Sequence, residues 1–107
     1  MFVIHKLVLQ PGLGHYSLPI GTEFLHAAIQ RGHPMLWYKR PMIAPSMENR
    51  MLLLIGTGQE IEAPAPDQRW HFISTMLTED QSFVFHVFEL VHECVRVTGD
   101  QLAGEDR

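Results

Sequence analysis

The stretch SFVFHVFELVHE, residues 82–93, combines the densest hydrophobic run of the chain with two histidines and two glutamates. On a helix, His86, Glu89 and Glu93 would line one face, which is the spacing that a metal site or an acid/base pair needs. On a strand, alternate side chains point to opposite faces, so a sheet would separate His86 from Glu89. The aromatic and β-branched residues of FVFHVF favour the strand. We therefore predict a central strand and no local metal motif.

A period of two also governs other apolar segments of the chain. FVIHKLVL alternates on two faces and predicts a strand largely covered on both sides. EFLHAAIQ and HPMLWYKR flank Arg31 and Gly32, and glycine there allows the positive φ of a tight hairpin. RMLLLIGTG reads as a buried strand ended by glycines, WHFISTML and SFVFHVFELV form a second hairpin, and PGLGHYSLPIG reads as a turn.

These segments predict a mainly β protein, a single-domain antiparallel sandwich or small barrel of about six strands. A chain of 107 residues fits one domain that needs neither a disulfide nor a metal. We place the β domain at residues 1–90. Hydrophobic density falls after it, and we assign residues 91–107 to a C-terminal extension that is either a short helix or a tail.

The composition excludes several classes of function and indicates a cellular compartment. A formal net charge of -4 argues against generic duplex-DNA binding, which needs an excess of Lys and Arg. Cys94 is the only cysteine, so intramolecular disulfides and cysteine-based zinc clusters are excluded, and we expect a reducing cytoplasm. The apolar runs are too short to cross a bilayer, and the start of the chain lacks the features of a secretory signal. No membrane partner is expected.

Basic and aromatic residues occur together between residues 31 and 40. Aromatic rings beside cationic side chains often hold a nucleotide or single-stranded nucleic acid by stacking and charge. The same residues also suit packing within a hairpin, and both interpretations stay open. The candidate ligand-binding residues are Arg31, His33, Trp37, Tyr38, Lys39 and Arg40.

Other motifs give little support for catalysis. GTGQEI lacks the lysine and hydroxyl residue of a nucleotide loop, so a turn explains its glycines better. The chain has seven histidines, but their spacing does not demand a metal, and Cys94 is expected to be an inert thiol. We therefore expect a protein without enzymatic activity, cofactor or assigned metal ligands.

Self-association is a further expectation. Unpaired strand edges are usually covered, charged or paired with another chain. If RMLLLIGTG lies outermost, pairing of two copies about a twofold axis would bury Met51, Leu53 and Ile55. The basic middle of the chain could then meet the acidic second half. We predict a homodimer.

The order of four stretches resembles an uncharacterised family of small proteins carried mainly by bacteriophages and prophages. Its members combine a Y-x-L-P element, a Q-x-G-x-P-x-L-W core, a GTG segment and a terminal FVFHVFE-like strand. The chain departs from that pattern after GTG, where Gln59 and Glu60 replace His-Pro. The resemblance implies a compact β-rich fold, a phage origin and no particular activity. The matching stretches are SLPIGTEFLHAAIQRGHPMLWY, LIGTGQEI, WHFISTML and FVFHVFEL.

The favoured function is that of a non-enzymatic phage accessory protein in the cytoplasm of an infected bacterium. It would bind a host or phage macromolecule, and inhibition of a host defence is one such role. The first alternative is a nucleotide-binding protein with a pocket near Trp37 and Arg40. The second is a metal-dependent enzyme.

Overall fold

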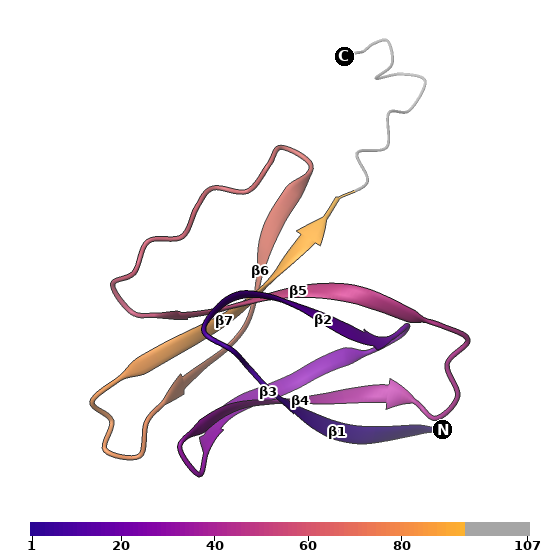
Figure 1. Cartoon of the computed structure of the whole chain (residues 1–107), viewed down its shortest axis with the longest axis horizontal. Coiled ribbons are helices and arrows are strands. Elements are labelled where there is room, and N and C mark those ends of the chain that lie inside the picture. Colours follow the sequence, from indigo (N-terminus) through magenta and orange to yellow (C-terminus); the bar gives the residue numbers. More distant parts are fainter. Residues whose placement is uncertain (94–107) are drawn as a thin grey trace.

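The computed structural model of the chain describes residues 1–93 and is all-β (Figure 1). Two antiparallel sheets form a sandwich, with strand order β1-β4-β3 in sheet A and β2-β5-β7-β6 in sheet B. The predicted mainly β, single-domain architecture is confirmed. Residues 1–93 include no helix long and apolar enough to cross a membrane. The strands are β1 (Phe2–Val8), β2 (Gly12–Pro19), β3 (Glu23–Gln30), β4 (His33–Pro41), β5 (Met47–Gly56), β6 (Gln68–Leu77) and β7 (Val84–His92).

The strand prediction for FVFHVFE is confirmed, and β7 is central, between β5 and β6. It runs to His92, so Val91 and His92 belong to the sheet. The remainder of the predicted C-terminal extension, including Cys94, lies outside the described residues. The β3–β4 hairpin is also confirmed, with φ of 54° at Arg31 and 80° at Gly32, as the mirror-image turns of tight hairpins require.

The sequence prediction missed β2, because its glycines and prolines read as a turn. Pairing with β5 overrides that local signal, with a ladder from Gly12 opposite Leu54 to Pro19 opposite Met47. Glycine at position 14 makes room for a neighbouring ring, because a Cβ there would lie 3.0 Å from Cε1 of Tyr16. Tyr16 then accepts a hydrogen bond from the Gln10 amide at 3.0 Å, which fixes the start of the strand.

The prediction that β1 is covered on both faces is wrong. Phe2, Ile4 and Val8 are 58%, 53% and 44% exposed. The other face of β1 is only partly covered, because Leu7 packs against the core whereas His5 is exposed. The face of sheet A that points away from sheet B is therefore open and partly apolar.

The position of β5 rules out the expected dimer interface, in which β5 strands pair edge to edge. β5 lies between β2 and β7, so both of its backbone edges are occupied and no β5 edge is free to pair with a second copy. Alternation with the core residue Leu52 places Met51, Leu53 and Ile55 on the face of sheet B that points away from sheet A. The homodimer itself stays a prediction.

The core lies between the two sheets. Leu36 of sheet A meets Leu52 and Val87 of sheet B, and all three are fully buried. At one side of the sandwich β3 approaches β6, and the Ala27 amide donates to Ser74 Oγ at 3.4 Å. This contact closes that side, whereas β1 and β2 end the sheets on the other.

The core predicts a sharp contrast between two large-to-small substitutions. Leu36→Ala should lower the free energy of unfolding by about 3 kcal/mol, because it leaves a cavity between the sheets. Phe83→Ala should change it by less than about 0.5 kcal/mol, because that ring is 63% exposed. Urea unfolding followed by tryptophan fluorescence measures both, and similar losses would contradict this placement of the core.

Candidate functional site

The predicted ligand-binding residues do not form one site. Along β4, Tyr38 and Arg40 share the inward face with Leu36, whereas Trp37 and Lys39 point away from sheet B. Arg31 and His33 lie at the β3–β4 turn, at one end of these faces. A single ligand therefore cannot contact all six residues.

Local contacts already engage several of these side chains. Trp37 lies beside His26, with ring centroids 6.2 Å apart. Lys39 pairs with Glu23 at 3.3 Å. The Arg40 Nε donates to the carbonyl of Pro41 at 3.0 Å. These contacts are the ones expected if the residues pack within the hairpin. The candidate residues do not share a pocket, and nucleotide binding stays a prediction.

His86 and Glu89, the two polar residues of FVFHVFE, point to opposite faces of the sheet, as predicted for a strand. His86 lies on the outer face of sheet B, where Nε2 meets Thr57 Oγ at 2.7 Å and Nδ1 meets Thr75 Oγ at 2.9 Å. Both ring nitrogens are therefore engaged. Across residues 1–93, no group of three or more His, Cys, Asp or Glu residues is arranged to hold a metal ion.

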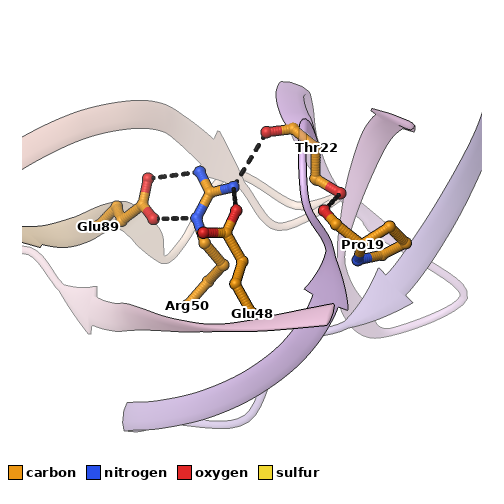
Figure 2. Close-up of polar contacts among 5 residues, drawn as sticks. All are labelled: Pro19, Thr22, Glu48, Arg50 and Glu89. Carbon is orange, nitrogen blue, oxygen red and sulfur yellow. Dashed lines mark hydrogen bonds and ion pairs between the residues drawn. The ribbon is translucent and has the colours of Figure 1, made fainter. Parts of the chain in front are cut away.

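Glu89, on the inner face, forms an ion pair with Arg50 of β5 (Figure 2). The guanidinium binds both carboxylate oxygens, through Nε to Oε2 and through Nη2 to Oε1 at 2.9 Å. Its Nη1 donates to the carbonyl of Thr22 at 3.0 Å and lies 3.4 Å from Glu48 Oε2. This arrangement is the two-pronged geometry in which Arg and carboxylate pair most strongly.

The pair is largely shielded from water. The side chains of Arg50 and Glu89 are 17% and 11% exposed, and the centroid of the Phe24 ring lies 4.6 Å from the guanidinium carbon. The hydrogen bond with Glu89 raises the pKa of Arg50 above its usual value, and this effect outweighs the opposing effect of burial. Because both oxygens of Glu89 accept from Arg50, this carboxylate is not free to act as a general base.

Sequence reasoning missed this pair, although a signal for it exists. Glu89 interrupts the apolar inward face of β7, and Arg50 directly precedes the apolar part of the inward face of β5. A charge in such a position needs a partner, because an isolated buried charge is costly. Two opposite charges on two apolar strands could therefore have been predicted to meet.

A separate cleft of about 840 Å³ lies at the end of the sandwich where the turns meet. Four chain connections contribute to it: β1–β2, β3–β4, β5–β6 and β6–β7. Its apolar lining comes from both sheets and includes Ile29, Pro34, Leu54, Ile55 and Phe85. An apolar cavity of this size can hold a small ligand or a few side chains of a partner.

Acidic residues line the cleft on the side of the β5–β6 and β6–β7 connections. Within residues 1–93, its charged lining residues are Glu60, Glu79 and Asp80, and no Lys or Arg lines it. Asp80 Oδ1 accepts hydrogen bonds from Ser82 Oγ at 2.6 Å, from the Ser82 amide at 3.0 Å and from Thr78 Oγ at 2.7 Å. These bonds, the Ser82 hydroxyl foremost, lower the pKa of Asp80 to about 2. Asp80 therefore stays ionised at all physiological pH values.

The GTGQ segment shapes one wall of this cleft as a turn. The Gln59 amide donates to the Gly56 carbonyl at 3.2 Å, and the Gly56 amide donates to Gln59 Oε1 at 2.6 Å. Gly58 has a φ of 92°, which glycine adopts readily. No helix follows the turn, so the segment does not have the geometry of a phosphate loop.

A family model described as "Domain of unknown function (DUF7352)" matches residues 1–97. This span contains all seven strands, the Arg50–Glu89 pair and the acidic cleft. No curated protein and no solved structure matches the chain. The expectation of an uncharacterised family is thereby confirmed, and the phage origin stays a prediction.

The ion pair predicts that substitution of Glu89 destabilises the protein far more than substitution of Glu93. Glu89→Gln should lower the free energy of unfolding by about 3 kcal/mol, because the Arg50 charge would remain buried without its partner. Glu93→Gln is the matched control. Glu93 pairs with Arg69 at 3.6 Å at the surface, and its loss should cost less than about 1 kcal/mol.

Urea unfolding of the two variants at neutral pH checks the difference. Equal losses would mean that Glu89 contributes no more than a surface charge. Arg50→Met combined with Glu89→Leu should recover most of the loss, because a well-packed apolar pair can replace a buried ion pair.

Proposed function

The chain belongs to the DUF7352 family, and we propose that it is a non-enzymatic binding protein whose acidic cleft engages a macromolecular partner. The observation that carries this proposal is the cleft itself, with apolar walls such as Leu54 and Phe85 below a rim of carboxylates. Apolar burial would supply most of the affinity, and the rim would select for charge and orientation.

The charge of the rim defines the chemistry of the partner. Glu60, Glu79 and Asp80 repel phosphate and carboxylate groups and attract ammonium or guanidinium groups. A protein segment that carries an apolar side chain next to Lys or Arg matches both parts of the site. A nucleotide does not match it, because its phosphates would meet three carboxylates.

The proposal of a non-enzymatic role rests on how the polar groups are used. His86 is held between Thr57 and Thr75, and Glu89 is held by Arg50. These contacts occupy the two polar side chains of the densest apolar segment, which a general acid or base there would need free. Binding is the activity that suits the remaining surface.

The biological setting of the proposal comes from the resemblance to phage and prophage proteins. In that setting the chain is an accessory protein in the cytoplasm of an infected bacterium. Its partner is a host or phage protein with a basic and apolar surface element, and a component of a host defence is one candidate of this kind.

The cleft predicts selective binding of a basic, apolar probe. Acetyl-Lys-Leu-Phe-Arg-amide should shift the amide resonances of residues at the four turns, among them Gly12, Gly32, Gly56 and Thr78. Acetyl-Glu-Leu-Phe-Glu-amide should bind at least about tenfold more weakly, because its charges repel the rim. Titration of isotope-labelled protein by NMR measures both affinities.

A matched pair of variants tests the location of binding. Glu79→Lys should weaken binding of the basic peptide by at least about fivefold. Glu93→Lys makes the same change of charge just beyond the end of β7, away from the cleft, and should leave binding almost unchanged. Equal binding of the two peptides, or equal effects of the two variants, would contradict the proposed site.

A further inference from the structure

We propose that the chain forms a homodimer in which the free edge of β1 pairs antiparallel with β1 of a second copy. Each sheet ends in two edge strands, β1 and β3 in sheet A and β2 and β6 in sheet B. Exposed edges carry unsatisfied backbone groups and are usually protected. The four edges differ in whether they have such protection.

Three of the edges are protected. β3 and β6 lie against each other, with the Ala27 amide bonded to Ser74 Oγ, and β6 has an irregular register between Phe72 and Ser74. β2 carries Gly12, Gly14 and, at its end, Pro19. Glycine weakens strand pairing and proline cannot donate to it, so β2 is a poor template for another strand.

β1 has none of these devices. Its residues, FVIHKLV, include no glycine, no proline and no irregular register with β4. Lys6 is the only Lys, Arg, Asp or Glu of this strand. Within residues 1–93, no segment pairs with its outer edge.

The hydrogen bonds to β4 identify which backbone groups are free. The Leu9 amide donates to the Pro34 carbonyl at 2.9 Å, and the Met1 carbonyl accepts from the Met42 amide at 3.1 Å. In an antiparallel ladder these directions alternate, so odd-numbered residues of β1 bond to β4. The amides and carbonyls of Phe2, Ile4, Lys6 and Val8 therefore point to the free edge.

One register satisfies all of these groups. A twofold axis at His5 places Phe2 opposite the second copy's Val8, and Ile4 opposite the second copy's Lys6. Each such pair exchanges two backbone hydrogen bonds, giving about eight across the interface. The exposed side chains of Phe2 and Val8 would then cover each other.

Neighbouring registers are less favourable. An axis at Lys6 would place two lysines directly opposite each other, and like charges there are destabilising. An axis at Ile4 would leave Val8 without a partner. The axis at His5 is therefore the register that uses the whole strand.

Pairing at β1 would join the two copies of sheet A into one continuous sheet with a twofold axis, the commonest symmetry of homodimers. No residue of β1 lines the acidic cleft, so the pairing leaves the cleft open. The dimer is thus independent of the proposed function, and either proposal can fail without the other.

Two substitutions at one exposed residue test the dimer and its register. Ile4→Lys places a new charge opposite Lys6 of the second copy and should raise the dimer dissociation constant at least about tenfold. Ile4→Glu also places a charge there, but of opposite sign, and should leave the constant unchanged or lower it. Ile4→Lys combined with Lys6→Glu should restore dimerisation.

Sedimentation velocity over a micromolar concentration series measures these constants, with circular dichroism as the check of folding. A wild-type monomer throughout the series, or equal weakening by Ile4→Lys and Ile4→Glu, overturns the proposal. Hydrogen exchange of the wild type gives a test without variants. The amides of Ile4 and Lys6 should exchange more slowly as the concentration rises, and rates that do not depend on concentration would also overturn it.

Discussion

Arg50 and Glu89 meet between the sheets, and their ion pair sets the positions of parts of the chain that are distant in sequence. Arg50 lies on β5 and Glu89 on β7. The same guanidinium donates to the carbonyl of Thr22, in the connection from sheet B to sheet A, and lies under the Phe24 ring of β3. Thr22 Oγ in turn donates to the Pro19 carbonyl at 2.7 Å (Figure 2). Arrangements that separate the two charges leave a buried ion unpaired, so they are strongly disfavoured.

The two ends of the sandwich have different properties. At the Arg50 end, polar contacts bind both sheets and the β2–β3 connection together. At the other end, four turns surround an apolar cleft whose rim is acidic. A rigid scaffold with a binding site on its connections is a common arrangement in β proteins, because turns can vary without loss of the core.

The sequence pattern was sufficient to predict β5, β7 and both hairpins, because β5 and β7 are strongly apolar runs and turn residues separate the arms of each hairpin. It failed for β2, where pairing with β5 overrides glycine and proline, and for β1, where alternation cannot tell a covered face from an open one. The cleft could not be predicted, since Ile29, Leu54, Glu79 and Phe85 come together only through the tertiary fold. The opposite error occurred for residues 31–40. These residues are adjacent in sequence but do not form one site, because neighbours along a strand point to opposite faces.

The central claim is that Arg50 is held by Glu89 inside the protein in solution. The direct measurement is the NMR resonance of the Arg50 Nε–H. The account predicts a resolved, slowly exchanging signal with a nuclear Overhauser effect to the ring protons of Phe24, and its loss in Glu89→Gln. A signal averaged by exchange with water, like that of an exposed arginine such as Arg69, would contradict it.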